Sequence, residues 1–409
     1  MDPQESFPLR AARWLAFGSA VSILFSIAVS QILLALGLAA LLLSGAPLRL
    51  PRIKLPLALF LLGTIISLAF SGNPAAGLPQ VRKFYVFCEL LVVFSALRDM
   101  ALIRWLFLTW AAFGSITAVR GLVQFAAKVQ QAHQLGMNFY DYYVSERITG
   151  FMSHWNTFTG QEMFALVMLA SFLFFAPEAR RRAWIWISCA VLLWLAIFLG
   201  ETRAVWIGTA VAAVYLVWFW QRRLVVLVPA VIALVIVVAP HDLRERFTSL
   251  LHPQQVDSNA FRLVTWRTGI RMVEAHPVLG LGPEMIKLHF KEWVAPDTPR
   301  PLPSGWYGHL HNIYLQYAAE RGIPVLLVFL WMIGRMFYDY WRGLRVLPPG
   351  RSDRKFLLHG GIAVTLAALA EGFFEMNLGD SEVLTMFLVV VACAYLALEK
   401  DLVNQSRDR

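Results

Sequence analysis

Residues 180–223 read RRRAWIWISCAVLLWLAIFLGETRAVWIGTAVAAVYLVWFWQRR, two apolar runs joined by a four-residue turn. Each run approaches the length of a membrane-spanning helix, which takes about 20 residues. Arginines flank the pair at 180–182 and 222–223, and Arg203 is the one cation in the turn. Because Lys and Arg collect in short cytoplasmic connections, the stretch predicts a helical hairpin whose turn faces away from the cytoplasm.

The same alternation of apolar runs and polar connections continues along the chain. Of its 409 residues, 58% are hydrophobic and 15% are charged, with a mean hydropathy of +0.59. Soluble domains are about half apolar and a quarter charged, so an all-α polytopic membrane protein is expected. Its three cysteines lie inside apolar runs, without the spacing of a metal site or a disulfide framework. Twelve spans are predicted, at 14–28, 30–45, 56–71, 83–97, 101–125, 157–176, 183–199, 203–219, 224–239, 323–340, 356–374 and 383–399.

Charge sets the expected orientation. With the N-terminus inside, most Lys and Arg fall in cytoplasmic connections, both termini are cytoplasmic, and the net charge of +10 follows from this bias and does not suggest nucleic-acid binding. Residues 1–409 are expected to form a single transmembrane domain, with the large outer loop 240–322 between spans nine and ten carrying short helices. The first two runs can also be read as one long helix, which would invert everything after them.

Several arginines fall at the predicted outer face. Arg147 precedes the sixth span, Arg203 begins the eighth, and Arg262 and Arg267 lie in a helical pattern in the large loop. Guanidinium groups bind phosphate oxygens in pairs, so this set is a candidate phosphate or pyrophosphate site. The alternative for each arginine is a head group that simply reaches water at the membrane interface.

Two further charges lie within predicted spans, near their outer ends. Arg120 is in the fifth span and Glu162 in the sixth. Charge at such depth is costly and usually has a partner. The two are expected to pair with each other or to orient the arginines, and a purely structural ion pair is the alternative.

The segment HLHNIYLQYAAERGIP (309–324) predicts a helix of about three turns from His311 to Arg321, which ends at Gly322 and Pro324. His311 is expected at the start of this helix, and His309 in the loop before it. The positive end of a helix dipole favours a neutral imidazole, the form that a general base requires. The two histidines can also chelate a metal as an i,i+2 pair, but no third ligand is evident in the sequence. A histidine that only packs within a loop is the remaining alternative.

These segments together resemble the O-antigen ligase and polymerase superfamily. His311, Asn312 and Gly322 match its pattern of His, then a polar residue, nine residues and Gly. FRLVTWRTGIRMVEAHPVLGLGPEMI (261–286) resembles its loop segment, and GETRAVWIG and RITGFMSHWNTF resemble its Arg-bearing elements. The resemblance extends over about 147–335, whereas the N-terminal spans match only in length and hydropathy.

The resemblance implies a GT-C type membrane glycosyltransferase in the inner membrane of a Gram-negative bacterium, with its active site at the periplasmic face. It would transfer O-antigen from undecaprenyl pyrophosphate to a sugar hydroxyl of lipid A–core, with inversion at the anomeric carbon. His311 would be the base and the arginines would bind the pyrophosphate, with the flanking membrane lipids as surroundings. Many GT-C enzymes hold a metal through acids of outer loops, but arginines can replace a cation at the pyrophosphate, so no metal or other cofactor is expected. Alternatives within the superfamily are an O-antigen polymerase and a protein O-oligosaccharyltransferase. A twelve-span transporter is the alternative from another class.

Overall fold

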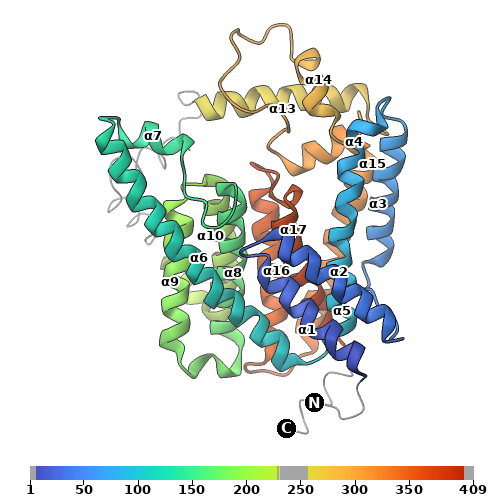
Figure 1. Ribbon diagram of the computed structural model, residues 1–409, viewed down its shortest axis with the longest axis vertical. Coiled ribbons are helices and arrows are strands. Elements are labelled where there is room, and N and C mark those ends of the chain that lie inside the picture. Colours follow the sequence, from blue (N-terminus) through green and yellow to red (C-terminus); the bar gives the residue numbers. More distant parts are fainter. Residues whose placement is uncertain (1–5, 228–229, 231–256, 400–409) are drawn as a thin grey trace.

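A computed structural model describes residues 6–227, 230 and 257–399 of the chain. Within these residues the regular elements are all helices, as the composition predicted (Figure 1). The elements, in chain order, are α1 (Phe7–Ser22), α2 (Ile27–Leu43), α3 (Lys54–Ala69), α4 (Pro74–Arg82), η1 (Lys83–Phe87), α5 (Cys88–Ala96), α6 (Met100–Gln134), α7 (Phe139–Ser145), α8 (Trp155–Phe175), η2 (Pro177–Arg180), α9 (Ala183–Leu199), α10 (Arg203–Gln221), η3 (Arg222–Val226), α13 (Asp257–Ala275), α14 (Met285–Trp293), α15 (Ile313–Val346), α16 (Asp353–Glu371), η5 (Asn377–Gly379) and α17 (Ser381–Leu396).

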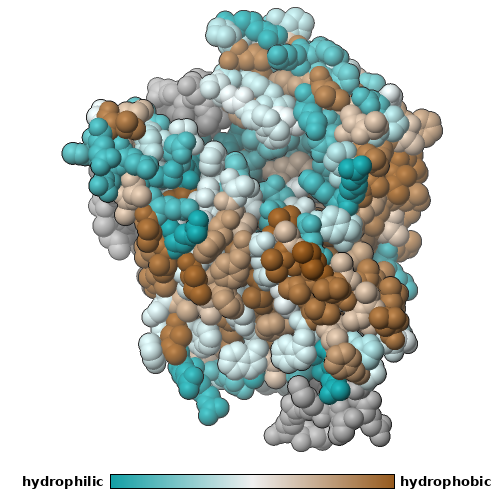
Figure 2. All heavy atoms as spheres, in the orientation of Figure 1, coloured by the Kyte–Doolittle hydropathy of each residue, from teal (hydrophilic) through white to brown (hydrophobic). Residues whose placement is uncertain are grey.

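The hydropathy of these helices fits a membrane protein. Four of them, α6, α8, α10 with η3, and α15, are long and apolar enough to cross a membrane. Large apolar side chains also face outward on shorter helices, for example Leu36 and Leu43 on α2 and Leu62 on α3. Figure 2 shows hydrophobic surface over much of the bundle and hydrophilic surface at the end covered by α13. The number of twelve spans remains a prediction, since most of the ninth, 224–239, lies outside the described residues.

The structure tests two details of the predicted spans. The first two runs are separate helices, α1 and α2, which pack against each other, so the single long helix is excluded. The predicted span 83–97 is wrong as one regular helix, because it begins as the 3-10 helix η1 and only Cys88–Ala96 is α-helical. The aromatic and β-branched residues of η1, Phe84 to Phe87, are weak helix formers.

The break that the sequence predicted at Gly322 is a sharp kink within α15. Gly322 has φ 81°, and a Cβ there would lie 2.0 Å from the Val278 carbonyl oxygen. Pro324 lacks an N–H and so leaves the Glu320 carbonyl without its helical donor. Ser67 Oγ (2.7 Å) and the Gly282 N–H (2.9 Å) donate to that carbonyl instead. The glycine-rich segment before α14 therefore docks on the kink.

Helices α13 and α14 form a layer across one end of the bundle (Figure 1). A small core holds this layer on the first turns of α15, with Met272, Ile286, Phe290, Leu310 and Ala319 buried together. Leu310 separates the two histidines of interest. The layer thus places both histidines over the ends of the bundle helices.

Candidate functional site

A cavity of about 1460 Å³ lies at this end of the molecule. Its wall comes from segments far apart in the sequence, including α4, the starts of α8, α10 and α13, the segment before α15, and the connection between α16 and α17. In Figure 2 hydrophilic side chains line a recess under α13. Five residues that the sequence singled out line the cavity: Arg147, Arg203, Arg262, His309 and His311.

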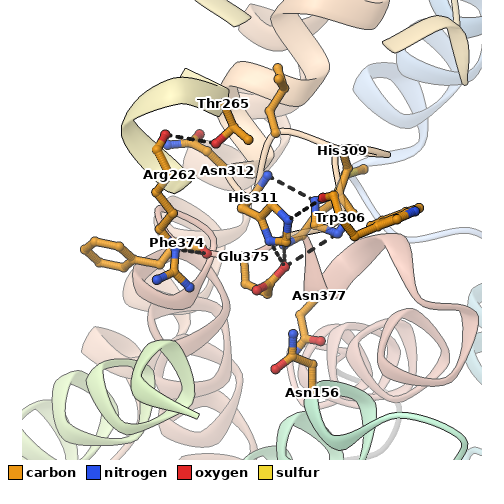
Figure 3. A network of polar contacts seen from close by, with 12 residues as sticks. Asn156, Arg262, Thr265, Trp306, His309, His311, Asn312, Phe374, Glu375 and Asn377 are labelled. Atoms are coloured by element: carbon orange, nitrogen blue, oxygen red, sulfur yellow. Dashed lines mark hydrogen bonds and ion pairs between the residues drawn. The ribbon is translucent and has the colours of Figure 1, made fainter. Parts of the chain in front are cut away.

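The central contact of the cavity joins His311 to Glu375 (Figure 3). His311 Nδ1 lies 2.9 Å from Glu375 Oε1. Burial alone would raise the pKa of the Glu375 carboxyl, but the hydrogen bond and charge of His311, with the charges of His309 and Arg262, lower this pKa to about 2. The carboxylate can only accept, so Nδ1 carries the proton. Glu375 therefore orients the ring and favours a positive charge on it.

His309 has a different role from His311. The His311 backbone N–H donates to His309 Nδ1 (3.0 Å), so that nitrogen is an acceptor. Burial, followed by the charge of His311, lowers the pKa of His309 to about 4 although Glu375 opposes this. A neutral His309 with its proton on Nε2, 3.6 Å from Glu375 Oε1, satisfies both contacts. His309 thus holds the backbone of His311, whose φ of 48° is uncommon for a residue other than glycine.

The other ring nitrogen of His311 points at the backbone. Its Nε2 lies 3.3 Å from the Trp306 carbonyl oxygen, which cannot donate a proton. A substrate hydroxyl that gives its proton to Nε2 must therefore take the place of this carbonyl. Trp306 is largely exposed, so few packing contacts oppose a shift of its segment.

Three arginines reach the same cavity from separate elements. Arg147 lies over the Trp155 ring, 5.2 Å from its centroid, and Arg203 is the first residue of α10. Arg262, on α13, donates to the Phe374 carbonyl (3.3 Å), next to Glu375 (Figure 3). The cavity therefore brings together cations that can bind phosphate oxygens and a histidine paired with a carboxylate.

Other predicted residues lie elsewhere. Arg267 is on the exposed side of α13, where it pairs with Asp297 at 2.8 Å, and it does not line the cavity. Arg120 donates to the Gly150 carbonyl (2.8 Å). Glu162 is fully buried in α8 and accepts a hydrogen bond from Thr117. The structure therefore gives Arg120 and Glu162 separate partners and does not place either in the cavity wall.

Asn312 and Gly322 support the site from behind. Asn312 caps α15, because its Oδ1 accepts from the Leu315 N–H (2.9 Å). Its Nδ2 donates to the Phe373 carbonyl (3.1 Å), which ties the histidine segment to the loop that carries Glu375. Gly322 permits the close approach of residues 277–282 described above. Helix α15 begins at Ile313, so His311 lies just outside it.

The two histidines and the carboxylate also form a candidate metal site. Ligand atoms of His309, His311 and Glu375 all lie within 4.8 Å of one another, and two His with one carboxylate is a donor set that zinc accepts. Glu375 supplies the third ligand that the sequence did not reveal. In the structure as it stands, the same atoms satisfy each other by hydrogen bonds.

Glu375 is the main residue of the candidate site that the sequence analysis missed. It lies in EGFFEMNLGDSE (371–382), between the last two predicted spans. A charged residue at the edge of a span is a signal of function in membrane proteins, so Glu375 could have been found. Asp380 and Glu382, two further acidic residues of this segment, also line the cavity. Asp380 accepts from Thr157 Oγ1 at 2.7 Å.

Fold and site together define a helical membrane protein with a polar cavity at one end, in which arginines face a histidine–carboxylate pair. Residues 188–330 match the profile of the family described as O-antigen ligase. This match confirms, for this segment of the chain, the resemblance to the O-antigen ligase superfamily that was drawn from the motifs. No curated protein matches the chain significantly. The matched segment contains Arg203, Arg262 and His311, and it ends beyond the kink at Gly322.

Proposed function

We propose that this protein is an O-antigen ligase that transfers a polysaccharide from undecaprenyl pyrophosphate to a sugar hydroxyl of lipid A–core. The observation that carries the proposal is the His311–Glu375 pair in one cavity with Arg147, Arg203 and Arg262. Such a reaction needs a base for the attacking hydroxyl and cations for the leaving group, and the cavity supplies both.

The proposed chemistry is a single displacement. The acceptor oxygen attacks the anomeric carbon, its proton passes to His311 Nε2, and the bond from that carbon to the pyrophosphate oxygen breaks. Glu375 stabilises the imidazolium that results, because it already accepts the Nδ1 proton. Arg147, Arg203 and Arg262 offset the charge that develops on the pyrophosphate. One attack from the face opposite the leaving group inverts the configuration of the anomeric carbon.

Residues beside the cavity support these roles. Asn312 and His309 fix the backbone around His311, and Gly322 lets residues 277–282 pack behind it. We place Arg267 among donor-binding residues only as a contact for parts of the polysaccharide outside the cavity, since its side chain is 58% exposed. Arg120 and Glu162 would act on the segment around Gly150 and on helix packing.

We place the protein in the inner membrane of a Gram-negative bacterium, with both termini cytoplasmic and the cavity facing the periplasm. The charge pattern supports this orientation. Arg203 lies in the cavity wall, whereas Arg180, Arg181 and Arg182 lie beyond the opposite ends of α8 and α9. Basic connections at that end fit the cytoplasmic side.

Reconstitution of the full-length protein tests the function. Purified protein in vesicles is mixed with undecaprenyl-pyrophosphate-linked O-antigen and lipid A–core in the presence of EDTA, and products are separated by size. Transfer to lipid A–core is expected, because the arginines take the place of a metal at the pyrophosphate. His311→Ala should abolish it, whereas His289→Ala, which removes an exposed histidine of α14, should not.

The other outcomes have distinct meanings. Extension of the lipid-linked donor without any lipid A–core product would identify the protein as an O-antigen polymerase, an enzyme of the same superfamily. If the folded protein gives neither product in EDTA but becomes active when zinc is added, metal independence is refuted. Absence of both products under every metal condition would overturn the proposed function.

A further inference from the structure

The wall of the cavity differs in charge from one side to the other. Arg147 and Arg203 come from the α7 and α10 side of the molecule (Figure 1). The α4 and α15 side instead presents hydrogen-bonding carboxylates and amides: Gln80, Glu284, Gln316 and Glu320. Lys83 also lies there, and its Nζ donates to the Gly379 carbonyl at 3.1 Å. The side that carries Arg147 and Arg203 is therefore the one suited to bind a pyrophosphate.

Glu320 is the residue on the second side with unused hydrogen-bonding capacity. It is 2% exposed and it lines the cavity. Its Oε1 accepts from Gln316 Nε2 (2.8 Å) and from the Glu284 N–H (3.0 Å). Its Oε2 has no hydrogen-bond partner, and Arg321 Nη2 is 3.7 Å away. A buried carboxylate oxygen without a donor is costly, which points to a donor supplied by a ligand.

This carboxylate is linked to the reaction centre through a short chain of contacts. Gln316 Oε1 accepts from the backbone N–H of Leu310 at 2.8 Å, and Leu310 lies between His309 and His311. Glu284, whose N–H donates to Glu320, is itself held in place, because Gln80 donates to its carboxylate and Lys287 pairs with it at 2.7 Å. A sugar bound at Glu320 would thus be positioned on the same framework as the base.

We propose that Glu320, with Gln316, Glu284 and Gln80, forms the binding subsite for an uncharged sugar of the acceptor, and that Glu320 Oε2 accepts a hydrogen bond from one of its hydroxyls. The proposal rests on the function proposed above. In an inverting displacement the acceptor and the leaving group occupy opposite faces of the reacting carbon. Arg147 and Arg203 would hold the pyrophosphate on one side, so the acceptor belongs on the other, where Glu284 and Glu320 repel phosphate and accept hydrogen bonds from hydroxyls.

Separate kinetic constants for the two substrates test this subsite. The acceptor KM, the donor KM and kcat are measured for the reconstituted wild type, Glu320→Gln and Gln80→Ala, with lipid A–core as acceptor. Loss of a hydrogen bond to a charged group predicts a rise in the acceptor KM of roughly 10- to 100-fold for Glu320→Gln. The donor KM should change by less than about threefold. Glu292→Gln, an exposed carboxylate on α14, is the matched control.

Gln80→Ala keeps the test valid if Glu320→Gln does not fold, because Gln80 is at the surface end of the subsite and only partly buried. A smaller rise in the acceptor KM is expected for it, again without a change in the donor KM. A changed donor KM or kcat with an unchanged acceptor KM, in whichever variant folds, would overturn the subsite. A wild type without transfer would instead refute the function itself.

Discussion

Glu375→Gln tests the pairing on which the proposed mechanism depends. The substitution keeps the shape of the side chain and removes its negative charge. The fall in the pKa of Glu375 from 4.5 to about 2 corresponds to roughly 3 kcal/mol of favourable interaction with the ionised form, at about 1.4 kcal/mol for each factor of ten. Most of this interaction comes from His311. If it also stabilises the imidazolium during proton transfer, its loss should lower kcat about 100-fold.

The assay is steady-state transfer to lipid A–core at saturating donor, over a range of pH. The donor KM should stay close to that of the wild type, because the arginines are unchanged. Glu375→Asp should recover part of the rate.

Thermal unfolding in detergent separates catalysis from stability. The folded-state pKa of Glu375 is depressed, so its ionised form contributes stability above about pH 4.5, and this contribution is lost as the pH falls towards 2. The wild type should therefore exceed Glu375→Gln in Tm at neutral pH, and the gap should close in acid. A folded Glu375→Gln variant whose kcat stays within about threefold of the wild type would refute the pairing of Glu375 with the catalytic base.

Three further predictions follow from the same geometry. Arg203→Ala should lower kcat/KM for the donor about 100-fold or more, whereas Arg267→Ala should change it less than about threefold, because an exposed ion pair contributes little; equal losses would contradict the assignment. Gly322→Ala should lower the Tm or the folded yield, since its φ of 81° and the 2.0 Å approach to Val278 leave no room for a Cβ; a wild-type Tm would argue against the kink. His309 has a folded-state pKa lowered to about 4, so wild-type stability should fall as the pH drops from about 6.5 towards 4; His309→Asn should flatten that part of a Tm-against-pH curve, and an unaltered curve would exclude His309 as the titrating group.

Much of the architecture could be predicted from the sequence because it depends on local patterns. Apolar run length predicted α9 (Ala183–Leu199) at the residues observed. Glycine and proline predicted the break at Gly322, where only a residue without a side chain fits against Val278. The prediction of one regular helix at 83–97 was wrong because an apolar run has the same hydropathy whether it is α-helical or 3-10.

The candidate site could be predicted only in part. Arg147 and Arg203 were found because each stands beside a predicted span end, and Arg262 and His311 were found because they lie in recognisable segments of the large loop. Arg267 was grouped with them because it lies in the same helical pattern of the large loop as Arg262. Five residues along a helix turn a side chain to another face, however, and Arg267 points outward.

Sequence alone determined that the chain is an apolar, all-helical protein with arginines and histidines gathered near one set of helix ends, since hydropathy and charge are properties of short segments. Only the tertiary structure decided that Glu375 meets His311 across 64 residues of chain and that Glu320, with one oxygen lacking a hydrogen-bond partner, lies in the wall of the same cavity. These contacts depend on how α13, α15 and the α16–α17 connection pack together. Packing of that kind is set by the shapes of surfaces distant in sequence, and no local pattern encodes it.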